Sequence, residues 1–182
     1  MDLVENVLNS VHVYDGNYFI CTCVAISKNT ALTAKHCIED IGIEGVIIDN
    51  TGHIQPLTNM MISLENDIGL LTTDDEFSNY LETENFSKDL LQVGEPISTY
   101  GYGCEHPKRI VLEEHQGTLK YVNSYEIAIS GHACGGDSGG PALRTNGKII
   151  GITARVDSLQ NATEVYLTPI WAGKNKVWES FK

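Results

Sequence analysis

Short apolar runs separated by polar residues and turn formers recur along most of the chain. Runs of this length that are rich in β-branched residues indicate β-strands, and regular turn signals between them are typical of antiparallel barrels. In the first half of the chain we expect strands at residues 11–14, 18–26, 31–33, 45–48, 53–55, 60–63 and 68–71. In the second half we expect strands at residues 96–102, 109–113, 117–122, 126–129, 142–144, 148–154 and 165–167. The pattern therefore predicts an all-β protein.

A polar segment at residues 74–89 separates the two sets of predicted strands and contains few residues that favour strands. We therefore expect a linker there, between an N-terminal unit of residues 1–80 and a C-terminal unit of residues 81–182. The length of 182 residues suits one compact unit or two small barrels that share an interface.

Composition narrows the classes of function. The net charge of −12 disfavours nucleic acid as a partner, because phosphates require basic patches. The sequence contains no apolar run long enough to span a bilayer, so we expect no membrane partner. Residues 1–5 lack the basic and apolar regions of a signal peptide. The localisation stays open between a mature secreted form and a leaderless intracellular or precursor-derived domain.

A glycine-rich stretch, residues 131–141, surrounds Asp137 and Ser138. Glycine lets the backbone turn sharply and approach another molecule closely, as a nucleophilic serine on a tight turn requires. A serine hydroxyl also needs a base and a group that orients the base. His36 ends one apolar, strand-like run, and Asp67 stands at the head of another. Each residue alone would be an ordinary turn, capping or buried residue, but their joint occurrence indicates nucleophilic catalysis.

Residues 31–37, 65–71 and 131–141 resemble, in this order, the signature motifs of trypsin/chymotrypsin-like serine proteases. The resemblance extends from about Val11 to Trp178. It implies two antiparallel six-stranded β-barrels with the active site between them, and a short closing helix at about residues 170–181. It also implies a serine endopeptidase that hydrolyses protein or peptide substrates, bound in extended conformation, through an acyl-enzyme.

The same resemblance assigns a role to each site residue. Ser138 attacks the peptide carbonyl, His36 transfers the proton, and Asp67 holds the histidine tautomer. The backbone N–H groups of Gly136 and Ser138 form the oxyanion hole. No cofactor is expected, and no metal, because the short spacings between the motifs imply that the calcium-binding loop of the digestive enzymes is trimmed.

The residues that would contact the substrate are unusual for the family. His132 occupies the position that is acidic in trypsin, and Glu164 is a wall position of the specificity pocket. Glu164 would attract a Lys or Arg side chain at P1, whereas His132, Thr153 and Arg155 would suit Glu or Gln. We expect the basic preference. A Glu164–His132 pair would cancel both effects. The full predicted set is His132, Ala133, Thr153, Ala154, Arg155, Val156 and Glu164.

Five cysteines leave at least one without an internal partner. The resemblance implies a Cys21–Cys37 disulfide that braces the histidine loop. A Cys104–Cys134 bridge is a second candidate, which would leave Cys23 as a small buried thiol. The alternative is that all five are reduced in an intracellular enzyme. A zinc site built from Cys21, Cys23, His36 and Cys37 would use the histidine that catalysis needs, so we do not expect it.

Besides the specificity pocket, two further departures from the family bear on function. Secreted members are activated when a new N-terminal Ile pairs with the aspartate before the serine, here Asp137, but no Ile-Val-Gly-Gly occurs. We expect a chain that folds active without cleavage or is switched by a regulatory partner. Ala154 and Arg155 replace a serine and a tryptophan of the family pattern. The sequence also leaves two alternatives to this endopeptidase. One is a viral polyprotein-processing protease with Glu or Gln at P1, and the other is a pseudoprotease binding module.

Overall fold

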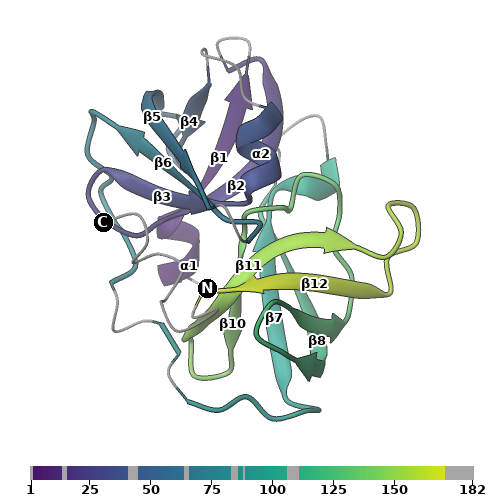
Figure 1. The fold of residues 1–182 in the computed structure, drawn as a ribbon. Coiled ribbons are helices and arrows are strands. Elements are labelled where there is room, and N and C mark those ends of the chain that lie inside the picture. Colours follow the sequence, from purple (N-terminus) through teal and green to yellow (C-terminus); the bar gives the residue numbers. More distant parts are fainter. Residues whose placement is uncertain are drawn as a thin grey trace.

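The computed structural model describes residues 2–13, 16–40, 45–63, 66–82, 86–87, 89–105 and 111–170, which form two closed antiparallel barrels (Figure 1). Each barrel contains six strands, so the predicted all-β class and paired barrels are confirmed. The closing helix expected at about residues 170–181 lies, apart from residue 170, outside the described residues.

The N-terminal barrel, purple to blue in Figure 1, closes in the order β1-β2-β3-β6-β5-β4. A short helix, α1 (Asp2–Val7), leads into it, and a second, α2 (Lys35–Asp40), follows its third strand. The strands are β1 (Leu8–Val13), β2 (Tyr18–Ala25), β3 (Thr30–Thr33), β4 (Val46–Ile48), β5 (Ile54–Ile62) and β6 (Gly69–Thr73).

The C-terminal barrel, teal to yellow in Figure 1, closes in the order β10-β11-β12-β9-β8-β7. A single 3-10 turn, η2 (Gly103–Glu105), follows its first strand. The strands are β7 (Pro96–Gly101), β8 (Glu113–Val122), β9 (Ile127–Ser130), β10 (Pro141–Arg144), β11 (Ile149–Val156) and β12 (Glu164–Pro169). The boundary after residue 80 falls between β6 and β7 and stays a prediction.

One pair of predicted strands is a single strand in the structure. Of the predicted strands 53–55 and 60–63, residues 54–55 and 60–62 belong to β5, which continues through Pro56 with a register shift between Leu57 and Asn59. Residues 117–122 belong to β8, which begins at Glu113, so the predicted separate strand at 109–113 is wrong where it is described. Gly117 lies inside β8, where a Cβ would come within 2.5 Å of the Ser130 carbonyl oxygen. This glycine marks a close approach of two strands.

Helix α1 was not predicted from the sequence. It spans only six residues, too few for a helical period to stand out. Its last residue, Val7, is fully buried and joins a cluster that includes Val24 of β2 and Ile152 of β11. The helix therefore contributes to the contact between the two barrels.

The apolar residues form a core inside each barrel and further clusters between the barrels. Cys23 of β2 faces the N-terminal core, whereas the next residue, Val24, faces the interface. Ile150 of β11 faces the C-terminal core, whereas Ile149 and Ile152 of the same strand face the interface. Strands buried on both faces read as continuous apolar runs rather than as alternating ones. Apolar side chains from both halves of the chain therefore bury one another at the interface between the barrels, where the sequence predicts the active site.

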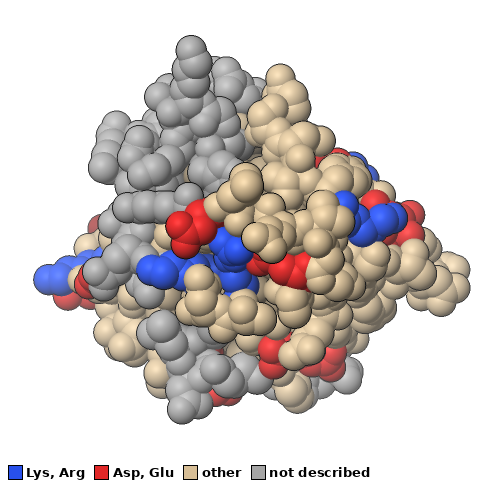
Figure 2. Space-filling view, turned by 90° about the horizontal axis from the view of Figure 1, so that it is seen from below, with Lys and Arg blue, Asp and Glu red and all other residues tan. Residues whose placement is uncertain are grey.

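The surface carries mixed charge. On the face that Figure 2 shows, basic side chains lie beside acidic ones, and no broad basic area is visible. With a net charge of −12 and no broad basic area there, that face offers no binding surface for a polyanion. In the described residues, no helix combines the length and the apolar character that are needed to cross a bilayer.

Candidate active site

His36 and Asp67 are brought together by the register of two neighbouring strands. β3 pairs with β6 so that Thr33 lies opposite Gly69, and His36 follows the first strand while Asp67 precedes the second. The Asp67 Oδ1 atom accepts a hydrogen bond from the backbone N–H of His36 at 3.0 Å. Its Oδ2 atom lies 2.8 Å from Nδ1 of the His36 ring. One carboxylate therefore fixes both the backbone and the ring of the histidine.

The charge state of Asp67 follows from these contacts. Burial raises the pKa of its carboxyl, but the hydrogen bonds from the His36 ring and backbone outweigh burial and hold the pKa below the ordinary 3.8. The carboxylate is ionised at neutral pH. An ionised acceptor at Nδ1 favours the tautomer that carries the proton on that nitrogen and stabilises an imidazolium if one forms.

Ser138 lies in the loop between β9 and β10, and this loop is anchored to both barrels. The Ser138 carbonyl accepts a hydrogen bond from the Thr22 N–H of β2 at 3.0 Å, and the Thr22 hydroxyl donates to the Gly136 carbonyl at 3.0 Å. The Gly139 N–H donates to the Thr153 carbonyl of β11 at 2.8 Å. Thr22 belongs to the N-terminal barrel, so that barrel positions a loop that the C-terminal barrel supplies.

Gly139 shows why this loop needs glycine. Its φ is +89°, and a Cβ at this position would lie 2.0 Å from the Thr22 carbonyl oxygen. Any side chain would force the loop away from β2. Gly136 has a φ of +95°, which also disfavours other residues.

A pocket of about 200 Å³ at the barrel junction is bounded by residues from both halves of the chain. His36 lines it from the N-terminal barrel and Ser138 from the C-terminal barrel, where the Ser138 hydroxyl donates to the Ala154 carbonyl at 3.5 Å. The other lining residues are Ala133, Cys134, Gly135, Thr153, Ala154, Arg155, Val156 and Leu159. This arrangement presents a hydroxyl, an imidazole backed by a carboxylate, and a hollow lined mainly by apolar and small groups.

Asp137, the residue before Ser138, is 3% exposed and has partners inside the chain. Its carboxylate accepts hydrogen bonds from the N–H groups of Gly103 at 2.7 Å and Cys134 at 2.8 Å, and one of its oxygens lies 3.6 Å from Nε2 of His115. Burial raises the pKa of Asp137, and the two N–H groups and His115 oppose that rise. Nothing in the sequence pattern connects His115 to Asp137, so sequence reasoning missed this partner.

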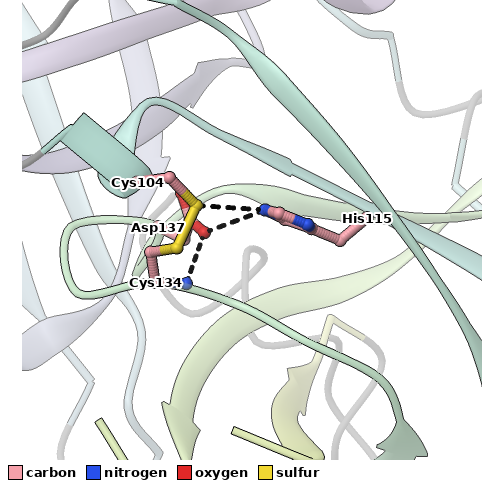
Figure 3. A group of neighbouring side chains, drawn as sticks. All are labelled: Cys104, His115, Cys134 and Asp137. Atoms are coloured by element: carbon pink, nitrogen blue, oxygen red, sulfur yellow. Dashed lines mark hydrogen bonds and ion pairs between the residues drawn. A yellow bond between two sulfur atoms is a disulfide. The ribbon is translucent and has the colours of Figure 1, made fainter. Parts of the chain in front are cut away.

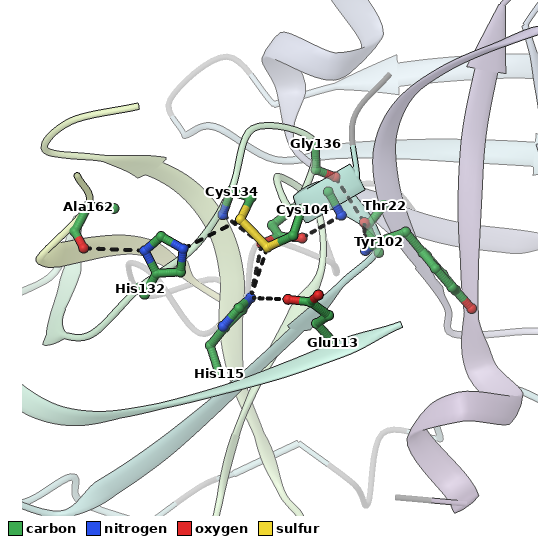
Figure 4. Close-up of a disulfide and its surroundings, with 11 residues drawn as sticks. Thr22, Tyr102, Cys104, Glu113, His115, His132, Cys134, Gly136 and Ala162 are labelled. Carbon is green, nitrogen blue, oxygen red and sulfur yellow. Dashed lines mark hydrogen bonds and ion pairs between the residues drawn. A yellow bond between two sulfur atoms is a disulfide. The ribbon is translucent and has the colours of Figure 1, made fainter. Parts of the chain in front are cut away.

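The charged residues predicted for the specificity pocket have other partners. Glu164 pairs with Lys120 of β8 at 2.9 Å, and that contact holds the pKa of Glu164 below its ordinary value. Exposed His132 lies 3.4 Å from the Ala162 carbonyl and 3.5 Å from the Cys134 sulfur (Figure 4). Among the described residues that line the pocket, neither Glu164 nor His132 is present.

Arg155 does line the pocket, but its guanidinium group contacts an acidic side chain and an aromatic ring. One guanidinium nitrogen lies 2.6 Å from a Glu126 oxygen, and the group stacks over the Tyr166 ring at 3.8 Å. Sequence reasoning missed both Lys120 and Glu126, because each belongs to a strand or turn whose place around the barrel is known only after closure.

The structure contains two disulfides, Cys21–Cys37 and Cys104–Cys134, and Cys23 is a buried thiol. The first ties β2 to α2 beside His36. The second ties η2 to the loop that carries Ser138, with His115 packed against it (Figure 4). Two groups have ligand atoms within 4.8 Å of one another, the residues Cys21, His36 and Cys37, and the residues Cys104, His115, Cys134 and Asp137.

Comparison with known proteins gives the same fold. The sequence model described as Trypsin matches residues 8–172. The active form of the Rv3671c protease from M. tuberculosis is similar in structure, with a TM-score of 0.77 at 13% identity over 96% of this chain and 81% of that one. The MamO protease domain from Magnetospirillum magneticum has a TM-score of 0.74 at 14% identity, over 92% of this chain and 93% of that one. Human heparin binding protein has a TM-score of 0.76 at 14% identity, over 97% and 89% of the two chains.

Proposed function

Because the chain belongs to the trypsin family, we propose that it is a serine endopeptidase in which Ser138, His36 and Asp67 form the catalytic triad. The observation that carries this proposal is the shared pocket. It is lined by Ser138 from one barrel and by His36 from the other, and His36 is held by the ionised Asp67. A nucleophile, a base and an orienting carboxylate from three separate segments are what acyl transfer requires.

The proposed reaction begins with attack of the Ser138 hydroxyl on a peptide carbonyl. Asp67 binds Nδ1 of His36, so we assign the proton transfer from Ser138, and later to the leaving amine, to Nε2. The backbone N–H groups of Gly136 and Ser138 are the proposed donors to the oxyanion, a role supported by their place in the glycine-rich turn. Water then hydrolyses the acyl-enzyme through the same histidine.

A fluorophosphonate probe tests the nucleophile directly. The wild-type protein should be labelled at Ser138, and Ser138→Ala should not be labelled. Ser124→Ala is the matched control, because it removes an exposed hydroxyl from the turn between β8 and β9. A folded wild-type protein that resists the probe would support the pseudoprotease alternative. The similar human protein is named for heparin binding, but the net charge of −12 does not favour a polyanion here.

For P1 we propose a preference for uncharged side chains of moderate size. A basic preference would depend on Glu164, but Lys120 neutralises that carboxylate, and Glu126 neutralises Arg155 in the same way. The remaining lining is formed by residues such as Ala133, Thr153 and Val156. A peptide-library cleavage profile tests this. A dominant Lys or Arg at P1 would mean that Glu164 acts on the substrate despite Lys120, and a dominant Glu or Gln would implicate Arg155 or His132.

We also propose that the enzyme folds active, without release of a new N-terminus. The carboxylate of Asp137 has three neighbours from the folded chain itself, the N–H groups of Gly103 and Cys134 and the His115 ring. These contacts supply the support that a buried carboxylate needs. Purified protein should cleave a peptide substrate with no activating protease present. Activity that appears only after proteolysis, or only with a regulatory partner, would contradict this proposal.

A further inference from the structure

Four potential metal ligands converge beside the loop that carries Ser138. Cys104 comes from η2, His115 from β8, and Cys134 and Asp137 from the loop between β9 and β10 (Figure 3). Their ligand atoms all lie within 4.8 Å of one another. Three segments far apart in the sequence therefore place two sulfurs, an imidazole nitrogen and a carboxylate oxygen around one point.

The spacing of these atoms suits a tetrahedral ion. In zinc sites, ligand atoms stand about 2.0–2.3 Å from the metal, so two ligands at the tetrahedral angle are about 3.3–3.8 Å apart. The Cys104 sulfur lies 3.4 Å from Nε2 of His115, and the same nitrogen lies 3.6 Å from Oδ2 of Asp137. These two separations already equal the edges of such a tetrahedron.

Contacts around the cluster hold the ligands in place from outside. Asp137 is 3% exposed, and its two oxygens accept the N–H groups of Gly103 and Cys134. The His115 side chain is largely buried and packs edge-on against the His132 ring, with centroids 5.2 Å apart. Glu113 brings a further carboxylate oxygen to 3.6 Å from Nε2 of His115. Such outer contacts orient ligands, and the surplus of negative charge favours a cation.

We propose that, when a thiol reductant opens the Cys104–Cys134 disulfide, these four residues bind one divalent cation of the zinc class. Two reductant thiols supply two electrons and two protons, so the protein disulfide becomes two cysteine thiols and the reductant becomes a disulfide. Metal binding then displaces those two protons to solvent, and no oxidation state changes in that step. Thiolate and imidazole ligands select zinc over magnesium or calcium.

The metal would replace the lost covalent link. The disulfide connects η2 to the Ser138 loop under oxidising conditions. In the reduced protein, the ion connects the same two segments and adds β8 through His115. The loop would therefore stay tied in either redox state. This inference concerns binding only and stands independently of peptide cleavage.

Cobalt reports the ligand set directly. The protein is reduced with a phosphine, which is then removed under argon, and it is titrated with Co²⁺ while absorption is recorded. We expect one equivalent of tetrahedral cobalt with thiolate-to-cobalt charge transfer, displaced by one equivalent of Zn²⁺, and no such signal before reduction. Absence of the signal in reduced protein would overturn the proposal. So would loss of the native circular dichroism spectrum on reduction that added metal does not restore.

Reduction also opens the Cys21–Cys37 disulfide, which frees a second group of potential ligands, Cys21, His36 and Cys37. Variants show which of the two groups binds the metal. The Cys21→Ser/Cys37→Ser protein should keep the cobalt spectrum, and Cys104→Ser/Cys134→Ser should lose it. His115→Gln, which keeps every cysteine, should weaken binding by more than about 100-fold, because loss of an outer-shell partner alone costs about 10–100-fold. His53→Gln, at an exposed histidine, is the matched control. Wild-type binding by His115→Gln, or loss of binding in Cys21→Ser/Cys37→Ser, would refute the site.

Discussion

His36 and Asp67 are held together by contacts within one barrel, whereas the loop of Ser138 is held by contacts from both. The first pair lies beside adjacent strands whose register, Thr33 opposite Gly69, brings the two residues into contact. The loop, in contrast, depends on Thr22 of the opposite barrel and on the close approach at Gly139. His36, the proposed base, is therefore positioned by regular sheet geometry, whereas Ser138, the proposed nucleophile, is positioned by single contacts such as those of Thr22 and Gly139. The nucleophile side should therefore be the more sensitive to small changes.

The largest expected effect is loss of the nucleophile itself. Ser138→Ala should lower kcat by about 10⁴-fold or more, because it removes the atom that forms the acyl-enzyme. Peptide hydrolysis under saturating substrate measures it. Asp67→Asn should approach the same loss, about 10⁴-fold, through the wrong tautomer of His36. Near-normal turnover by Ser138→Ala would eliminate the proposed triad. A small effect of Asp67→Asn alone would show that His36 keeps its position without the Asp67 carboxylate.

Gly139→Ala should be the most damaging change that leaves the triad side chains intact. The new Cβ would stand 2.0 Å from the Thr22 carbonyl oxygen, so the loop must move away from β2. We expect a lower free energy of unfolding and a lower rate of fluorophosphonate labelling. Gly147→Ala is the matched control, since Gly147 has a φ of +81° with no atom within 4 Å of its Cβ position. That change should cost only about 1–2 kcal/mol of backbone strain. Equal losses in the two variants would mean that the approach to Thr22 is not the constraint.

Thr22→Val should give an intermediate effect. It keeps the shape of a fully buried side chain but leaves the Gly136 carbonyl and the Tyr102 N–H without the Thr22 hydroxyl. Unsatisfied buried groups cost about 1–3 kcal/mol each, and chemical denaturation would measure the sum. Labelling of Ser138 should slow as well, because the loop loses its side-chain link to the other barrel and keeps only the bond from the Thr22 backbone N–H to the Ser138 carbonyl. Thr58→Val, at an exposed hydroxyl on β5, should change neither quantity. A Thr22→Val protein that matches wild type in both quantities would show that the Thr22 hydroxyl does not help to hold the loop.

The smallest expected effect is the pH dependence of stability that arises from Asp67. The pKa of Asp67 is lower in the folded protein than its ordinary value of 3.8, so the ionised carboxylate stabilises the fold at any pH above that value. This contribution is lost as the pH falls below 3.8 through the folded pKa. The difference in melting temperature between wild type and Asp67→Asn should therefore shrink as the pH falls from about 5 through the folded pKa of Asp67. A difference that grows over this acid range would contradict the assigned direction.

The sequence determined most of the fold because strand patterns are local. Neighbouring side chains on a strand face opposite sides, so short apolar runs such as residues 31–33 and 68–71 were recognisable without their partners. The errors arose where a local signal had a long-range cause. Residues 53–55 and 60–63 were expected to form two strands, yet β5 runs from Ile54 to Ile62, where it pairs first with β4 and then with β6. The sequence also singled out His36, Asp67 and Ser138, since each lies in a short run with its own pattern.

Which charged groups pair with one another depends on the assembled fold. Lys120 pairs with Glu164 and His115 faces Asp137, although each pair is separated by more than twenty residues. Thr22 likewise reaches the Ser138 loop only because two closed barrels pack together. Such pairings depend on strand register and barrel closure, which set distances between side chains that no local pattern encodes. The chemistry at Ser138 is thus suggested by its own segment, while the state of the charges around it is a property of the assembled fold.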